Sequence, residues 1–229
     1  MTQVVQPHTG ATIKPGPMVT VVPERAVTDA QLADVASGSG LNAPFLADQL
    51  SGFVTHERMG GNLLRMLHSR TANPMFQAMY AELLASCTGA VETWERLITD
   101  LGGNPQYASP AARLHEGMDA KIVESLLLPG SADPLSLETA GLMAAWSALQ
   151  MSLLHAECLG QFASAADDGA AKDAMTAASA ALVTTATTGR DQVRKALDTS
   201  MSTQAKHPMA QKVLQGMEKA TAVVKDKLR

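Results

Sequence analysis

Two long amphipathic helical patterns separated by a very short turn constrain the fold of this chain more than any other feature. Apolar residues recur at helical spacing in 46–67 and again in 75–98. Between these stretches, Asn73 is a favoured helix cap, and Pro74 suits a first helical turn because its missing N–H has no intrahelical partner there. A connection this short predicts that the two helices lie side by side and antiparallel.

A second pair of long helices is predicted in the C-terminal half. One begins at Asp133-Pro134 and continues to a tight turn at 167–169, and the next runs from about Ala170 to His207-Pro208. The long connection between the two pairs contains a shorter helix that is capped by Ser109 and continues through Leu128. The order of elements is therefore hairpin, crossover helix, hairpin.

Composition supports an all-α protein. Hydrophobic residues make up 46% of the chain and charged residues 17%, which is typical of a folded domain. Aromatic residues are only 3%, beside 13 Met, so the core is expected to be aliphatic and methionine-filled, as packed helices allow. The net charge of −4 argues against nucleic-acid binding.

Location is inferred from three features. No apolar run approaches the length of about 20 residues that crosses a bilayer. The N-terminus lacks the charged start and apolar stretch of a secretory signal. Cys87 and Cys158, the only cysteines, fall within apolar helical patterns, so no disulfide framework is expected. We expect a cytoplasmic protein without a transmembrane segment.

The two ends of the chain differ from its centre. Residues 1–40 form an extended, proline-rich arm with one short capped helix at 28–35 and a flexible joint at 37–40. The bundle follows at 41–207, and 208–229 is a C-terminal helix with a basic polar side. The arm is either a partly ordered tail or a segment that docks on a neighbouring subunit.

Four segments carry a family resemblance, from about Phe45 to Glu138: FLADQLSGFVTHERMGGNLLRML, SRTANP, LITDLGGNPQYASPAARL and LLPGSADPLSLE. They resemble a bacterial family of ferritin-like domain proteins. The resemblance implies a ferritin-like four-helix bundle, made of two antiparallel hairpins with a long crossover. It also implies a pair of metal ions in the active members, held by a Glu on two helices and a Glu-x-x-His pair on the other two.

The residues at the expected metal-binding level are mostly neutral. Glu57 lies in the family-like string Thr-His-Glu-Arg, and counting from the turn places it opposite Cys87, where 86–90 contains neither a carboxylate nor a histidine. The same count places the middle of the third long helix, at 149–150, opposite 186–187 of the fourth. We interpret the following as a vestigial bundle centre: Glu57, Cys87, Ala90, Leu149, Gln150 and Thr187.

Loss of these ligands predicts loss of the metal pair. Glu57, even with His56, cannot hold two dications, so these two are residual metal candidates and no cofactor or catalytic residue is assigned. Glu57 is then either partly exposed or paired with Gln150, a threonine hydroxyl or water. The six histidines show no metal-ligand spacing along the chain.

Three functions remain open. The first is a non-catalytic bundle that acts through protein association, as a homo-oligomer or part of a larger assembly, because 170–188 is almost entirely small and apolar. The second is a metal-dependent oxidoreductase with unconventional ligands, drawn from Glu57, His56, Glu92, His155 and Glu157. The third is a small-molecule carrier with an apolar pocket near Cys87, Gly89 and Ala90.

Overall fold

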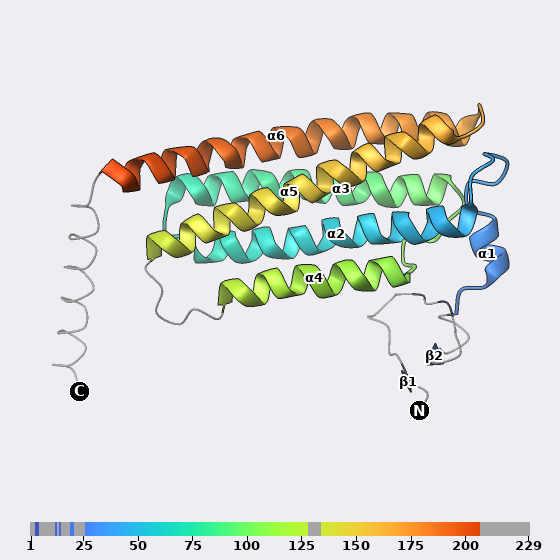
Figure 1. Cartoon of the computed structure of the whole chain (residues 1–229), viewed down its shortest axis with the longest axis horizontal. Helices are drawn as coiled ribbons and strands as arrows, with labels where there is room; N and C mark the ends of the chain where they lie inside the picture. Colours follow the sequence, from blue (N-terminus) through green and yellow to red (C-terminus); the bar gives the residue numbers. More distant parts are fainter. Residues whose placement is uncertain are drawn as a thin grey trace.

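The computed structural model describes residues 3–4, 12, 14, 19–20, 26–127 and 134–206. Helices dominate this part of the chain, which confirms the all-α prediction (Figure 1). Their bounds are α1 Asp29–Ala33, α2 Ala43–Arg70, α3 Pro74–Asp100, α4 Pro110–Leu127, α5 Pro134–Ala165 and α6 Ala170–Lys206. Two short strands, β1 Gln3–Val4 and β2 Val19–Thr20, pair in parallel near the N-terminus.

The helices begin where the sequence predicts caps. The Asn73 side chain accepts a hydrogen bond from the N–H of Met75 at 3.0 Å, and Pro74 occupies the first turn of α3. Ser109 caps α4 by accepting from the N–H of Ala112 at 3.1 Å. Thr28 and Gln31 form a reciprocal capping box at α1. Local chemistry therefore sets these helix starts.

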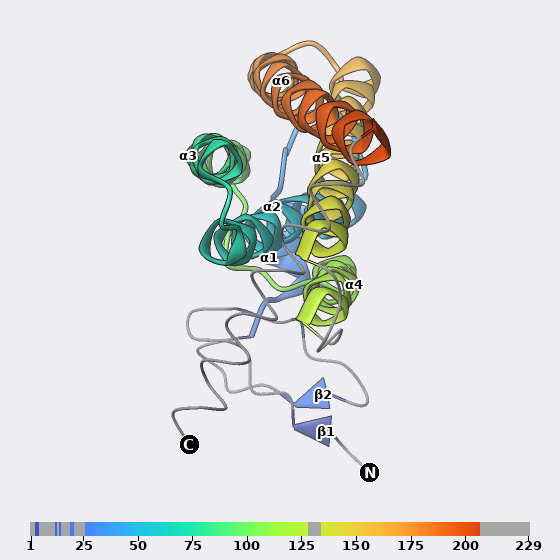
Figure 2. The ribbon, with the colours of Figure 1, turned by 90° about the vertical axis from the view of Figure 1, so that its left-hand side faces the viewer.

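Four long helices form two hairpins that pack on each other. Helices α2 and α3 form the first hairpin, and α5 and α6 form the second; α2 lies beside α5, and α3 lies beside α6 (Figure 2). Contacts from His56 to Ala148 and from Leu67 to Gly141 show that α2 and α5 run in opposite directions. Each neighbouring pair of these four helices is antiparallel.

Helix α4 carries the chain from one end of the bundle to the other. It runs parallel to α2, since the Ser109 hydroxyl bonds the Asp48 carbonyl at 3.0 Å, whereas Asp119, further along α4, contacts His56. The close approach depends on Gly52, where a Cβ would lie 3.1 Å from the His115 ring. Helix α4 thus covers the outer side of α2 and also contacts α5.

The segment before α2 holds the turn of the second hairpin. The N–H of Asp167 donates to the Ser39 carbonyl at 2.8 Å, and the N–H of Ala36 donates to the Leu101 carbonyl at 2.8 Å. Gly40 has a φ of +73°, and a Cβ there would lie 2.6 Å from the Asp167 carboxylate. Residues 37–40, predicted as a flexible joint, form a defined turn in which Ser39 is buried.

The core consists of two clusters along the bundle. One surrounds Trp94 and Phe53 near the end that contains α1, and the other surrounds Tyr80 and Leu142 near the α2–α3 turn. Some predicted core positions are wrong, because they lie on the outward sides of their helices: Met75 is 66% exposed, Met143 48% and Leu154 49%.

The predicted absence of a transmembrane segment and the predicted ends of the chain can be compared with the described residues only. Among the described helices, none combines the length and hydropathy that a bilayer crossing requires. The predicted C-terminal helix at 208–229 lies outside the described residues, and so do 1–2, 5–11, 13, 15–18 and 21–25 of the predicted arm.

Candidate functional site

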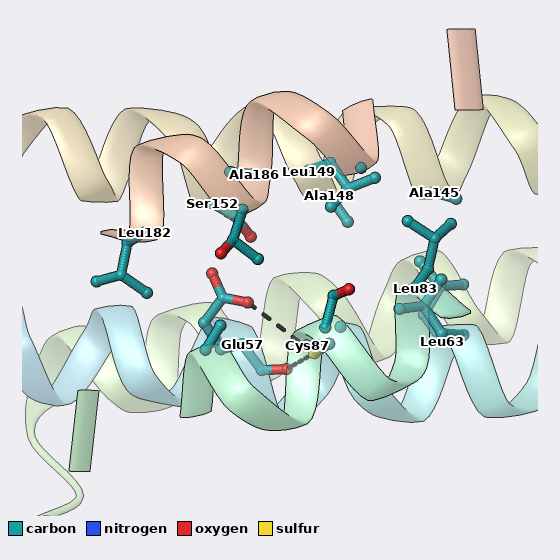
Figure 3. Close-up of a pocket in the computed structure, with 16 residues that line it drawn as sticks. Glu57, Leu63, Leu83, Cys87, Ala145, Ala148, Leu149, Ser152, Leu182 and Ala186 are labelled. Atoms are coloured by element: carbon teal, nitrogen blue, oxygen red, sulfur yellow. Dashed lines mark hydrogen bonds between the residues drawn. The ribbon is translucent and has the colours of Figure 1, made fainter. Parts of the chain in front are cut away.

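A small cavity lies at the centre of the bundle, between the two core clusters. Its volume is about 30 Å³, which is room for one or two water molecules. Of the residues that line it, Glu57 is the one carboxylate, and most of the others are small or aliphatic (Figure 3). The lining includes Cys87, Ala90, Ala148, Leu149, Ser152, Leu182, Ala186 and Gly189.

Glu57 is buried with 6% of its surface exposed, so its environment favours the neutral acid. Burial raises the pKa of Glu57, while the Ser152 hydroxyl and the charge of His56 oppose that rise without cancelling it. Ser152 of α5 faces the carboxyl group across the cavity (Figure 3). The predicted partly exposed Glu57 is therefore wrong, and its hydroxyl partner is a serine.

Cys87 lies where the hairpin count places it, directly against Glu57. Its thiol donates to the Glu57 carbonyl at 3.1 Å, and its Sγ lies 4.0 Å from Glu57 Oε2. Burial raises the pKa of Cys87 to about 12, and the Glu57 carboxyl adds to the rise while Arg65 opposes it. The thiol is thus a protonated packing group and a poor nucleophile at neutral pH.

Four of the six residues interpreted as the vestigial centre line the cavity. Glu57, Cys87, Ala90 and Leu149 line it together, whereas Gln150 and Thr187 do not. Gln150 instead accepts a hydrogen bond from Arg190 at 3.3 Å. Each is one position away from a lining residue, and one position rotates a side chain by about 100° around a helix.

A second group of polar side chains lies on the other side of α2, where α4 and α5 meet it. His56 of α2 directs Nδ1 to Asp119 Oδ2 of α4 at 2.8 Å and Nε2 to the Ala148 carbonyl of α5 at 3.0 Å. The rings of His115 and His155 contact this imidazole and each other edge-on, at centroid separations of 4.9–5.8 Å. We call His56, His115, Asp119 and His155 the histidine cluster.

The histidines of this cluster differ in charge. Burial lowers the pKa of His56, but the hydrogen bond and charge of Asp119 outweigh it and leave that pKa above 6.5. Both ring nitrogens of His56 face oxygen acceptors, which fits the doubly protonated ring. The pKa of His155 falls to about 3 through burial and then the charges of His56 and His115. Burial and His56 also lower the pKa of His115.

The two groups differ in their capacity to hold a metal ion. Around the cavity, Glu57 faces thiol, hydroxyl and methyl groups, which are poor ligands for a pair of dications. In the histidine cluster, His56, His115 and Asp119 each offer one ligand atom, and these atoms lie within 4.8 Å of one another. Of the predicted unconventional ligands, His56 and His155 are in ring contact and Glu57 is buried, whereas Glu92 and Glu157 are exposed.

This cluster was not predicted from the sequence, although one part of it has a local signal. His115 and Asp119 are four residues apart on a predicted helix, so they share one face of it. That spacing was a usable signal. Their meeting with His56 depends on how α4 packs on α2, which the local pattern does not determine.

Comparison with known proteins adds no family. No family model, curated protein or solved structure matches the chain. Functional conclusions therefore depend on the geometry of the two groups and on the surface of the bundle.

Proposed function

We propose that this chain is a non-catalytic, ferritin-like bundle that acts through protein association, with a second copy of itself as the partner. The proposal has three supports: the arrangement of the helices, the chemistry of the bundle centre and the character of one surface.

The helix arrangement is compatible with ferritin-like ancestry. Ferritin-like bundles have two antiparallel hairpins joined by one long crossover. Here the crossover contains α4, which runs the length of its neighbour α2 while the hairpins pack with α2 beside α5 and α3 beside α6. This ancestry is part of the proposal, and it identifies the bundle centre as the level at which metal ligands would lie.

The bundle centre favours packing over catalysis. The level at which a ferritin-like protein would place its metal ligands contains Glu57 opposite Cys87, Ser152 and Ala186. The cavity of about 30 Å³ is also far smaller than the pocket of a drug-sized ligand, typically about 300 Å³ or more. The carrier hypothesis would therefore require the helices to move apart.

A surface without charge carries the association proposal. No charged residue occurs in 83–91 of α3 or in 174–189 of α6, and these two helices lie beside each other. We call the exposed members of both segments the neutral surface: Ala85, Ser86, Thr88, Gly89, Thr176, Ala177, Ala180, Ala181, Thr184 and Thr188.

Removal of water from the neutral surface costs little free energy. Thr88, Thr184 and Thr188 donate their hydroxyls to carbonyls of their own helices at 2.8–2.9 Å, so these groups keep a partner when water leaves. Small side chains let helices approach closely, and two identical uncharged surfaces meet without charge repulsion. The second copy is thus a chemically suitable partner.

Light scattering coupled to size exclusion tests the proposal. The full chain has a mass of 24.0 kDa, and we expect a larger, concentration-dependent particle mass. Ala181→Glu places a charge in the neutral surface, because Ala181 is exposed on α6, and should weaken association at least about tenfold.

Ala120→Glu is the matched control, since Ala120 is an exposed alanine on α4, away from α3 and α6. It should leave the mass unchanged. A monomer at the highest attainable concentration, or equal effects of the two substitutions, would contradict the proposal.

A further inference from the structure

We propose that His56, His115 and Asp119 form a binding site for one divalent transition-metal ion of the Zn²⁺ class, where the crossover helix α4 meets α2. This site lies outside the bundle centre and is independent of the association proposal. Its ligands would be two imidazole nitrogens and one carboxylate oxygen.

The distances suit one ion. The three ligand atoms lie within 4.8 Å of one another, and His56 Nδ1 and Asp119 Oδ2 are 2.8 Å apart. Ligand atoms around a tetrahedral Zn²⁺ are about 3.4 Å apart, given metal–ligand bonds of about 2.0–2.1 Å. Binding therefore requires side-chain shifts of about an ångström and no rearrangement of the helices.

The partner of the other ring nitrogen supports this assignment. Ligand histidines in metal sites usually donate their second N–H to a carboxylate or a backbone carbonyl, which fixes the ring. His56 Nε2 already donates to the Ala148 carbonyl at 3.0 Å, so Nδ1 is directed at the site, and metal binding would release the Nδ1 proton to solvent. This contact comes from α5, and it is independent of the two ligands on α4.

The ligands differ in burial in a way that suits metal entry. His56 is only 2% exposed, whereas His115 and Asp119 are half-buried on the outer helix. An ion can reach the site from the α4 side, and three protein ligands leave a position for water. Beside them, His155 is 4% exposed and its Nδ1 has no hydrogen-bond partner in the described part of the chain. A buried polar atom without a partner indicates a missing one, and a metal-bound water is of the right chemistry.

The competing explanation is that His56 and Asp119 form only a structural ion pair. That pair accounts for two of the three ligand atoms and leaves the inward position of His115 unexplained. An ion pair also predicts that removal of His115 changes no metal affinity, so the two explanations are separable.

Isothermal titration of the chelator-stripped full chain with ZnCl₂ provides the test. We expect one equivalent of Zn²⁺ per chain, with a Kd of about 1 μM or tighter. His115→Ala, a change on the outer helix, should weaken binding by about a hundredfold or more. Asp119→Asn should do the same, and circular dichroism before titration establishes that each variant is folded.

His68→Ala is the matched control, because His68 is an exposed histidine on α2. It should bind Zn²⁺ like the unmodified chain. Co²⁺ supplies a second readout, since its visible absorption bands report coordination by the protein and should vanish in both cluster variants. A wild-type Kd weaker than about 100 μM, or an unchanged Kd in His115→Ala, would overturn the site.

Discussion

At the residue scale, His155 shows how burial and neighbouring charge determine the state of one ring. The imidazole stacks on Phe53 of α2 at a centroid separation of 4.4 Å and meets His56 and His115 edge-on. A proton on this ring would lie in an apolar setting beside the positive charge of His56, with the Asp119 carboxylate already paired to that charge. The ring therefore stays neutral in the folded protein, with a pKa of about 3.

This state predicts a pH-dependent stability. The pKa of His155 is about 3 in the folded chain and near 6.5 when unfolded, so between these values only the unfolded chain takes up the proton. Stability should fall as pH drops through that window, by up to about 1.4 kcal/mol per pH unit from this residue. His155→Phe keeps the stacking but cannot be protonated, so it should lose less stability than the wild type.

Urea unfolding at pH 7, 5.5 and 4.5, with a metal chelator present, measures this difference. The free energies of unfolding of His155→Phe and wild type should diverge in favour of the variant as pH falls. His56 has a raised pKa and acts in the opposite direction, but it is present in both proteins. His68→Phe, on the surface, should run parallel to wild type. Parallel curves for His155→Phe would refute the assignment of a neutral buried ring.

At the scale of elements, one buried serine joins the start of α4 to α2 by hydrogen bonds. The Ser109 hydroxyl donates to the Asp48 carbonyl at 3.0 Å and accepts from the N–H of Ala112 at 3.1 Å. Its own N–H donates to Ser51 Oγ at 3.1 Å. Ser109 thus caps one helix and ties it to another, and it is fully buried.

Ser109→Ala should therefore destabilise the protein by about 1–2 kcal/mol, since it removes the cap and leaves the N–H of Ala112 without its partner. Thermal and urea unfolding measure the loss. Ser125→Ala on the same helix is the control, because the exposed Ser125 hydroxyl bonds only the Lys121 carbonyl and its removal should cost less than about 0.5 kcal/mol. Equal losses at both positions would show that the attachment does not depend on Ser109.

At the scale of the whole molecule, the layer of Glu57, Cys87 and Ser152 separates the two halves of the core. Apolar clusters lie on both sides of this layer, and the cavity lies within it. A buried carboxyl in such a layer reduces stability once the unfolded chain can ionise and the folded one cannot. The layer therefore weakens the middle of an otherwise continuous core.

Glu57→Leu should raise the free energy of unfolding. The pKa of Glu57 is raised on folding, so its stabilising contribution is complete below pH 4.5 and is lost as pH rises toward the folded pKa. The variant should exceed wild type by about 1–2 kcal/mol at pH 7 and by less at pH 4.5. Urea unfolding at both values tests this. Glu92→Leu makes the same change at an exposed site on α3 and should not stabilise; a destabilised Glu57→Leu would show that the carboxyl is needed for folding.

How much could be predicted from the sequence depends on the range of the forces involved. Helix starts at Pro74 and Pro110 follow from caps and prolines, which act over a few residues, and the level of Glu57 against Cys87 follows from counting back from a tight turn. The rotation of α5 could not be predicted, because that helix is apolar on nearly every side; Ser152 faces the centre where Gln150 was expected. The histidine cluster needs α4 to lie parallel to α2, a long-range contact without a local signature.

The contact of residues 39–40 with the Asp167 turn fixes one end of the second hairpin. That end of the α5–α6 hairpin is pinned by a backbone bond and by a glycine with no room for a side chain. Near the opposite end of α5, the Glu138 carboxylate accepts a hydrogen bond from the Thr71 hydroxyl at 2.7 Å, and a Cβ on Gly141 would lie 2.7 Å from the Leu67 side chain. Separation of α5 from its neighbours would thus break a hydrogen bond at either end of that helix.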